Sequence, residues 1–440
     1  MKYLTAIFFA LLILTTVVSA QEIPGPPQTN PVLLKGGTIH TVSGDTIEKG
    51  QLLFAEGKIT AIGKKVKPLP KTKVIDVTGK HIYPGMFESH SNMGLTEISA
   101  VKATRDFSET GDINSNVKAL VSVYPDNMII PVTRANGVLF ALTAPTGGII
   151  SGKSAILNLD GWTYEEMSLK DEASMQINWP SQFISPRQRA RMDEKEINET
   201  KKRQAKNLQL LRKTFEDARL YHAAIDSKNS TQAYDARLDA MGSVLDGSLP
   251  VMVRADRASD IQSAIAFAVE QKIKMIILGG YDAVKCDNLL KKYDIPVIVS
   301  ATHRTPRRRG DAYDAAYSLP ERLRKSGIRF CISSTDKSET WNTRTLPYHA
   351  AMAVGFGLPK EEALKAVTLY PAQILGVDDR IGSLEVGKDA SLIVTTGDPL
   401  ETTTQTEMAF IEGRKVDLSN RHLRLHKKYQ QKYRQLGKSK

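Results

Sequence analysis

The sequence of 440 residues predicts an α/β protein with parallel strands at its centre and a small β-rich unit built from both ends of the chain. Between residues 250 and 355, apolar strand-like runs alternate with segments of helical spacing. Near-continuous apolar strands of this kind are typical of a parallel sheet that is buried on both faces. Right-handed crossovers between such strands allow an open doubly wound sheet or a closed barrel, and periodicity does not separate the two.

Residues 1–20 have the three parts of a secretory signal peptide. Lys2 supplies the positive charge, an apolar run follows from Leu4, and the small residues before Gln21 form a cleavage site. An N-terminal membrane anchor is the alternative, but the run is short for a span and has no stop-transfer flank. We therefore expect export to the periplasm or the extracellular space. No second stretch is long and apolar enough to span a membrane.

The N-terminal β-rich unit is predicted from short strands separated by turn residues, at 32–42, 51–54 and 58–62. So few short strands do not bury a core alone. Two further strands are expected near the C-terminus, at 391–395 and 408–412. We expect the N-terminal and C-terminal strands to complete one composite sandwich.

The middle of the chain alternates strands and helices. We expect another strand at 131–141, a glycine-rich loop at 143–152 and a long, charged helical region at 185–225. Four strand–helix units follow, and a helix at 360–375 begins after a proline and ends before a glycine. The expected strands of the four units are 250–255, 274–280, 296–301 and 328–334, and their helices are 259–271, 282–293, 311–325 and 346–355.

Cys286 and Cys331 are the two cysteines of the chain. Export permits a disulfide between them, but a pair of cysteines does not establish one. Cys331 lies in an apolar strand-like run and Cys286 in a helix-like one. We expect two buried free thiols.

Much of the net charge of +12 is concentrated in the C-terminal tail. Eight lysines or arginines and no acidic residue lie between Arg421 and Lys440. Such a tail can bind nucleic acid or an anionic surface. We do not expect nucleic-acid binding in an exported protein, and we favour a solvated helix or a frayed end.

The stretch from Val74 to Glu97 contains Asp76, Gly79-Lys80, Pro84-Gly85 and His90. It resembles the D-x-x-G-K-x-x-x-P-G-x-x-x-x-H-x-H start of the barrel in the amidohydrolase superfamily, especially its imidazolonepropionase-like metal-dependent hydrolases. Residues 346–399 also match the family, at the end of the barrel and the return to the β domain.

The resemblance implies a TIM-type (β/α)8 barrel with a composite small β-sandwich. The implied organisation is a signal peptide at 1–20, the N-terminal part of the sandwich at 31–83, the barrel at 84–380, the C-terminal part of the sandwich at 381–417 and a basic tail at 418–440.

Three residues match positions that bear the family's chemistry. The resemblance places His90 at the first ligand of the H-x-H pair. It places Asp336 at the aspartate that acts as ligand and proton shuttle, which makes Asp336 the candidate base. His303, in a T-H-x-x-P pattern, is expected to line the pocket. The implied cofactor is one divalent metal ion, zinc by family resemblance, and otherwise none.

Three other ligand positions are substituted. A metal hydrolase holds its ion with neutral imidazoles or carboxylates. Asn92 stands where the family has its second histidine, and an amide is a poor zinc ligand. Arg254 replaces the histidine of a V-H-A sequence and would repel a metal ion. Gly279 stands about where the next histidine ligand falls. His90 is then also explained as a hydrogen-bonded barrel histidine, and Asp336 could pair with Arg254.

A second feature is the arginine-rich loop after the 296–301 strand, with Arg304, Arg307, Arg308 and Arg309. In a parallel α/β barrel, functional residues lie at the barrel mouth, the end formed by the C-terminal ends of the strands. With Arg254, the loop could give this mouth a positive charge suited to a carboxylate or a phosphate. A solvated loop explains the same residues.

Two functions remain as hypotheses. In the first, the chain is a low-activity or non-catalytic family member that binds a small-molecule or peptide-like ligand or forms an oligomer with an intact amidohydrolase. In the second, it is an active hydrolase of cyclic amides or dipeptide-like amides, which uses a single ion held by His90 and Asp336. Whether the chain is an enzyme stays open.

Overall fold

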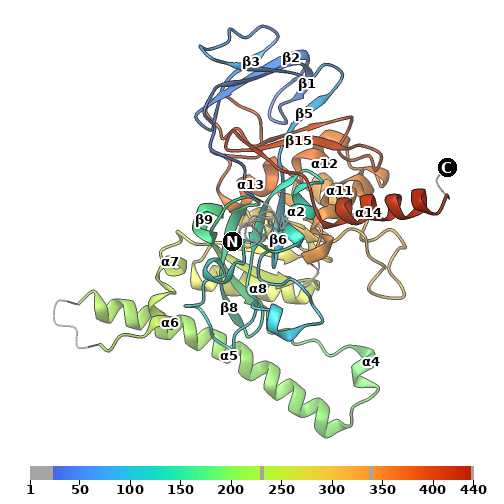
Figure 1. Cartoon of the computed structure of the whole chain (residues 1–440). Coiled ribbons are helices and arrows are strands. Elements are labelled where there is room, and N and C mark those ends of the chain that lie inside the picture. The colour runs from blue at the N-terminus through green and yellow to red at the C-terminus, as the bar shows by residue number, and fades with distance from the viewer. Residues whose placement is uncertain (1–22, 228–231, 336–339, 438–440) are drawn as a thin grey trace, which may run out of the picture.

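A barrel with surrounding helices and a separate β-sheet make up the computed structural model of the chain, which describes residues 23–227, 232–335 and 340–437 (Figure 1). The predicted signal peptide lies outside the described residues. Within the described ranges, no helix has the length and apolar character that crossing a bilayer requires.

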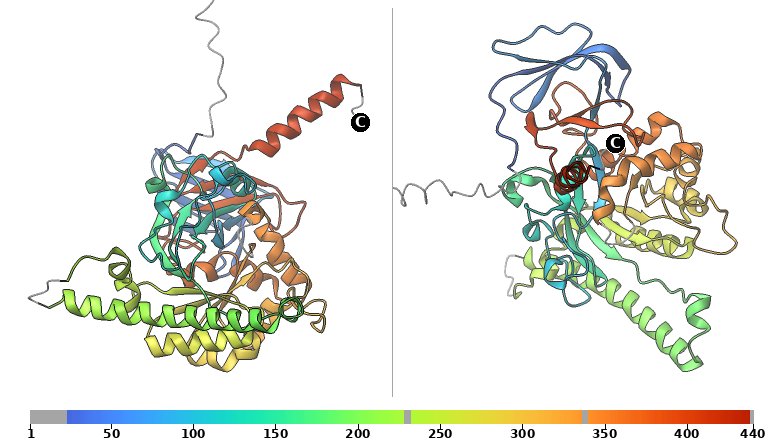
Figure 2. Two further views of the ribbon diagram at one scale, coloured as in Figure 1. Left: turned by 90° about the horizontal axis from the view of Figure 1, so that it is seen from below. Right: turned by 45° about the vertical axis from the view of Figure 1, so that its right-hand side comes forward.

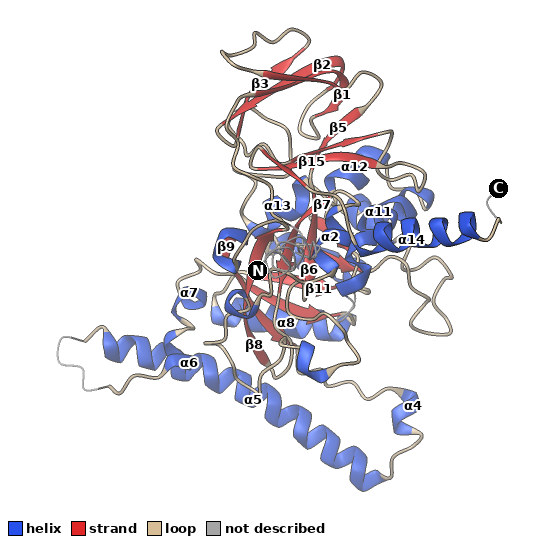
Figure 3. Ribbon diagram, in the orientation of Figure 1, coloured by secondary structure: helices blue, strands red, loops and turns tan. Residues whose placement is uncertain are grey.

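The barrel is an eight-stranded sheet that closes almost completely (Figure 3). Its strand order follows the chain from β6 to β13. The pairs β6–β7 and β9 through β13 are parallel, whereas β8 runs antiparallel to both of its neighbours. The barrel prediction is confirmed, with one reversed strand. The strands are β6 Met86–Ser91, β7 Val138–Thr143, β8 Ile150–Asn158, β9 Ser168–Asn178, β10 Val251–Ala255, β11 Met275–Gly279, β12 Val297–Ser300 and β13 Phe330–Ser333.

Two predictions in the first half of the barrel are wrong. The segment 131–141, predicted as a strand, divides into the helix α2 (Ile129–Arg134) and β7, with Gly137 at a φ of +83° between them. The predicted glycine loop at 143–152 already contains the first residues of β8. Gly152 adopts a φ of +126° at a register shift between β8 and β9. A glycine inside a strand marks such an irregularity, so it did not indicate a loop here.

The region predicted as one helix at 360–375 is broken into α12 (Lys360–Lys365) and α13 (Leu369–Leu375). The break frees two backbone carbonyls for the barrel. The carbonyl of Ala366 accepts a hydrogen bond from the amide of Ile332 in β13 at 2.9 Å, and that of Val367 accepts one from Phe87 in β6 at 2.8 Å. The segment between the helices therefore joins the first barrel strand to the last.

Helices pack around the barrel after most of its parallel strands. The predicted helices at 282–293 and 311–325 are shorter than expected. A 3-10 turn precedes α9. The helix α10 begins only at Leu319, and Asp311 instead accepts hydrogen bonds from the Tyr281 hydroxyl and the backbone amide of Arg308. The main helices are α5 Glu194–Ile225, α8 Ala258–Gln271, α9 Asp287–Lys292, α10 Leu319–Lys325, α11 Leu346–Gly355 and α14 Arg421–Gln435. Short helices are α3 Tyr164–Met167, α4 Pro186–Arg189, α6 Ala236–Asp239 and α7 Gly242–Leu245, with 3-10 turns at Lys102–Thr104, Leu120–Ser122, Ala283–Cys286 and Thr340–Thr345.

The second sheet combines strands from both ends of the chain, as the sequence predicts (Figures 1 and 3). Its order is β16-β15-β14-β5-β1-β2-β3, with β4 paired to β1. The two ends meet where β5 pairs antiparallel with β14, and they share a buried apolar core. The strands are β1 Val32–His40, β2 Thr46–Ala55, β3 Lys58–Gly63, β4 Lys73–Asp76, β5 His81–Pro84, β14 Leu392–Thr395, β15 Thr406–Ile411 and β16 Arg414–Val416.

Both cysteines are free and buried, as predicted. Burial raises the pKa of the Cys331 thiol to about 12, so this side chain remains protonated at neutral pH.

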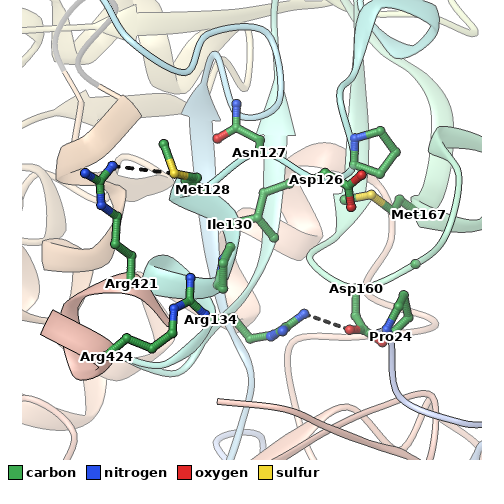
Figure 4. A pocket seen from close by; sticks show the side chains of 13 residues that line it. Pro24, Asp126, Asn127, Met128, Ile130, Arg134, Asp160, Met167, Arg421 and Arg424 are labelled. Atoms are coloured by element: carbon green, nitrogen blue, oxygen red, sulfur yellow. Dashed lines mark hydrogen bonds and ion pairs between the residues drawn. The ribbon is translucent and has the colours of Figure 1, made fainter. Parts of the chain in front are cut away.

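A buried carboxylate, Asp160, links the barrel to the two ends of the chain (Figure 4). It accepts hydrogen bonds from Arg134 of α2 at 2.7 Å and from the amide of Gly25 at 3.0 Å. Arg414 of β16 contacts the same carboxylate at 3.3 Å. The Asp160 and Arg134 side chains are almost completely buried. A charge in such a place is stabilised only while its partners remain.

We expect Asp160→Ala to lower the free energy of unfolding by roughly 3–5 kcal/mol, because it leaves the buried Arg134 guanidinium without its carboxylate. Chemical denaturation measures this loss. The matched control is Asp217→Ala, which removes a carboxylate from the exposed pair with Lys213 and should cost about 0.5 kcal/mol or less. Equal losses in the two variants would contradict the structural role of Asp160.

Candidate functional site at the barrel mouth

His90 lies near the C-terminal end of β6, where it is buried. Burial and, secondarily, the Arg254 guanidinium hold the pKa of His90 well below its usual value. His90 is therefore a neutral imidazole. Its Nδ1 has no hydrogen-bond partner among the described residues. The structure thus brings His90 and Arg254 of β10 together, with an imidazole able to accept a bond from a ligand.

Asn92 follows His90 and holds the end of a neighbouring strand. Its Nδ2 donates to the carbonyl of Ala144 at 2.6 Å. Its Oδ1 is buried, and no donor in the described parts of the chain reaches it. The amide therefore has a structural partner on its nitrogen side and an unused acceptor on its oxygen side.

Glu88 lies two residues before His90 and is completely buried between β6 and β13. Its carboxylate accepts hydrogen bonds from the backbone amide of Ser334 at 3.0 Å, from the Ser334 hydroxyl and from the amide of His90 at 3.2 Å. Burial raises the pKa of Glu88 to about 6, although these hydrogen bonds act in the opposite direction. Glu88 thereby orients the backbone that carries His90.

Gly279, at the end of β11, lies against Asp256. Gly279 has a φ of +104°, and a Cβ added there would lie 2.8 Å from Oδ1 of Asp256. The carboxylate of Asp256 also pairs with Arg307 at 2.6 Å and lies 3.8 Å from Arg304. A histidine at 279 would need both a strained backbone and the displacement of this ion pair.

Tyr281 is the centre of a cluster of arginines. The guanidinium carbons of Arg304, Arg307 and Arg308 lie 5.3, 5.6 and 5.7 Å from the centre of its ring. The Tyr281 hydroxyl donates to Asp311 at 2.9 Å. Cations placed over an aromatic face in this way are attracted by its quadrupole. The predicted arginine loop is therefore attached to the end of β11 through Tyr281, while Arg307 and Arg309 remain exposed to solvent.

Arg308 and Asp256 extend the cluster into an ionic network. Arg308 pairs with the partly buried Asp282, and its backbone amide donates to Asp311 at 3.0 Å. Asp256 directly follows the predicted strand at 250–255, and a carboxylate at a strand end could have marked it as a candidate site residue. Its ion pair with Arg307 could not be predicted, because the two residues follow different strands.

His303 is exposed and stacks on His349 of α11, with ring centres 4.2 Å apart and an angle of 25°. The hydroxyl of Thr302 lies 3.1 Å from Nδ1 of His349. Burial, followed by the proximity of His303, lowers the pKa of His349 to about 3. The pocket position of His303 stays a prediction, and no pattern in the sequence singled out His349.

Asp336, the candidate base, lies outside the described residues, and so does its expected pairing with Arg254. Among residues 23–227, 232–335 and 340–437, no three or more His, Cys, Asp or Glu side chains are grouped so that they could hold a metal ion. The site that the structure describes therefore consists of a neutral histidine, an asparagine and an arginine-rich ionic network.

The sequence and the fold are both similar to known proteins. The model of the Amidohydrolase family matches residues 314–418. The crystal structure of an amidohydrolase from Thermotoga maritima has a TM-score of 0.78 and 26% identity, and the match covers 88% of this chain and 99% of that one. The chain is thus similar to the amidohydrolase family in the sequence of residues 314–418 and in its fold.

Curated relatives in the amidohydrolase family match over more limited parts of their length. Amidohydrolase tasK of Hapsidospora irregularis is 22% identical over 394 residues, which are 83% of this chain and 39% of tasK. Imidazolonepropionase of Syntrophobacter fumaroxidans is 33% identical over 104 residues, 23% of each chain. The chain thus spans well under two thirds of these relatives. An adenosine deaminase from Xanthomonas campestris that shares the fold has bound zinc, with 14% identity and a TM-score of 0.50.

We expect His349 to make the protein sensitive to mild acid. The pKa of His349 in the folded chain lies below the usual histidine value of 6.5, so the unfolded chain takes up the proton first as the pH falls. Stability is complete above pH 6.5 and decreases below it, by about 2 kcal/mol between pH 7 and pH 5. Denaturation of His349→Asn at both pH values should lack this loss. His422→Asn, at an exposed histidine, is the control. An unchanged pH dependence in His349→Asn would contradict the prediction.

Proposed function

We propose that this chain is an exported, ligand-binding member of the amidohydrolase family with little or no hydrolytic activity of its own. The observation that carries the proposal is the contact between Gly279 and Asp256. The space that a side chain at 279 would need holds the Asp256 carboxylate. That carboxylate forms an ion pair with Arg307, so a histidine side chain at position 279 would have to displace it.

The described residues do not fit the divalent ion that the family resemblance implies. Arg254 places a fixed positive charge beside His90 and lowers its pKa. Asn92 uses its amide nitrogen to bind Ala144. A cation next to a guanidinium would be repelled, and an amide oxygen attracts zinc weakly. These contacts support a site that works without a bound metal ion.

The ligand that suits the arginine-rich mouth carries a carboxylate. Arg307 and Arg308 each keep about a third of the side chain exposed while they pair with Asp256 and Asp282. A guanidinium has five N–H donors, so it can bind an aspartate and a ligand carboxylate together. The neutral His90 imidazole and the Asn92 Oδ1 offer acceptors for a ligand N–H group. A small amide or peptide-like molecule with a free carboxylate has both features.

A partner subunit is the second part of the proposal. The chain matches only 39% of tasK while it uses 83% of its own length. Most of tasK therefore lies outside the segment that matches this chain. We propose that a separate, catalytically intact amidohydrolase chain supplies the hydrolytic site in a hetero-oligomer.

The alternative is an active hydrolase of cyclic or dipeptide-like amides that uses His90 and Asp336 with a single ion. One observation favours it. Nδ1 of His90 and Oδ1 of Asn92 are both buried acceptors that no described residue satisfies. Buried polar atoms are normally hydrogen-bonded, so a bound group at this place is expected in either function.

Zinc binding separates the two functions. After dialysis against micromolar zinc, we expect the purified chain to retain no stoichiometric metal by elemental analysis, because Arg254 repels a cation at His90. One tightly held zinc ion per chain that is lost in His90→Ala would overturn the proposed function and support the alternative. The His422→Ala variant is the control, since it removes an exposed imidazole on α14, outside the barrel mouth.

Binding of a carboxylate tests the ligand proposal. We expect N-acetyl-L-alanine to bind more tightly than its neutral amide in calorimetry. Arg307→Gln should weaken binding of the acid by roughly tenfold or more, because a hydrogen bond to a charged group contributes about 1.5–3 kcal/mol. Arg309→Gln, which removes a nearby exposed arginine outside the Tyr281 cluster, should leave the affinity unchanged. Equal affinities for acid and amide would contradict a carboxylate site.

A further inference from the structure

The C-terminal helix α14 extends away from the body of the protein (Figures 1 and 2). Asn420 caps its first turn through a hydrogen bond from the amide of Leu423 to its side chain at 3.1 Å. None of the residues from Arg421 to Gln435 is buried. Isolated helices of this length are marginal in water, so a helix held out in solvent needs a reason beyond packing within the chain.

One face of α14 is apolar and aromatic. Leu425, Tyr429 and Tyr433 follow one another at intervals of four residues, and Leu436 lies one turn further. Residues at this spacing share a helix face. Tyr429 and Tyr433 are each 49% exposed. The stripe is therefore open to solvent along its length.

The rest of α14 is strongly basic. Six lysines or arginines and no acidic residue lie between residues 421 and 437. Arg421, Arg424, Lys428 and Lys432 border the stripe along one side, and Lys427 and Arg434 lie on the opposite face. A helix with an apolar aromatic stripe and a polar face of lysine and arginine is the kind that lies in the surface of a membrane.

The stripe continues onto the body at the root of the helix. His422, in the first turn of α14, lines a pocket together with Trp341, Ile98 and Ile129. Trp341 is 40% and Ile98 45% exposed. Arg421 reaches Met128 of the body, with its NH1 nitrogen 3.6 Å from the sulfur (Figure 4). Tryptophan and tyrosine are the residues that favour the boundary between lipid and water.

We propose that α14, together with Trp341 and Ile98, binds the surface of a membrane that contains anionic phospholipid. The stripe lies at the boundary of headgroups and acyl chains, and the flanking lysines and arginines contact lipid phosphates. This role is independent of the ligand proposed for the barrel mouth. It also differs from a membrane span, since the helix is too short and too polar to cross a bilayer.

The charge of α14 distinguishes between three possible binding partners of its apolar stripe. A second copy of α14 would place two sets of basic residues side by side without compensating acids, and like charges repel. A soluble polyanion would use the lysines and arginines but would leave the tyrosine and leucine stripe exposed. An anionic lipid surface satisfies both faces of the helix.

Vesicle binding tests the proposal on the purified chain that begins at Gln21, without the predicted signal peptide. We expect binding to vesicles of phosphatidylcholine with phosphatidylglycerol, little binding to phosphatidylcholine alone, and weaker binding as salt increases. Lys428→Gln with Lys432→Gln should lower the partition coefficient roughly thirty-fold, since each basic residue near an anionic surface contributes about a factor of five. Circular dichroism checks that the variants remain folded.

Two leucines of α14 provide a matched pair of variants. Leu425→Ser removes a residue of the stripe and should weaken vesicle binding several-fold, whereas Leu423→Ser removes a comparably exposed leucine from outside it and should not. Tyr429→Ser with Tyr433→Ser should also reduce binding. Binding that loses affinity only with the lysines, or that is as strong to heparin as to vesicles, would identify a soluble polyanion and overturn the proposal. Unchanged binding after truncation at Asn420 would overturn it as well.

Discussion

Closure of the barrel between β6 and β13 is the constraint on which the rest of the structure depends. These are the two edge strands of the sheet, and individual hydrogen bonds join them instead of a regular strand pairing. The carbonyls of Ala366 and Val367 bind one strand each at one end of the junction. At the other end, the hydroxyls of Ser333 and Thr335 donate to the carbonyl of His90 at 3.2 and 2.6 Å.

Glu88 completes this junction from inside the barrel. A buried carboxylate is stable there only because the Ser334 and His90 amides supply hydrogen bonds to it. The same bonds hold the backbone amide of His90 in β6 and that of Ser334 just after β13. The position of His90 thus follows from how the barrel closes. A substitution of Glu88 would remove its hydrogen bond to the His90 amide directly.

The sequence was sufficient for the parts of the fold that rest on local pattern. The parallel strands β10 to β13 were predicted because each is a continuous apolar run between turn signals. The break at residues 366–368 was not predicted, because it is stabilised by hydrogen bonds to β6 and β13. Both strands are distant from the break in the sequence, so local pattern does not reveal these bonds. The reversed β8 was hidden by Gly152, whose turn-like character reflects an irregular register.

The same distinction applies to the site. His90, Asn92, Arg254 and Gly279 were found because they occupy positions of a family motif. Glu88 and Tyr281 were missed because their importance comes from contacts between strand ends. A tyrosine after two glycines carries no signal until three arginines are seen around its ring.

The positions at which the family resemblance implies metal ligands take part in separate interactions, so a histidine placed at any one of them would disrupt existing contacts. A histidine at 92 would leave the Ala144 carbonyl without the Asn92 amide. A histidine at 279 would have to displace Asp256, and that would expose Arg307 to the loss of its partner. Residues that share partners do not contribute additively. The contacts of Asn92, Gly279 and Asp256 therefore stabilise the barrel mouth together in its arginine-rich form.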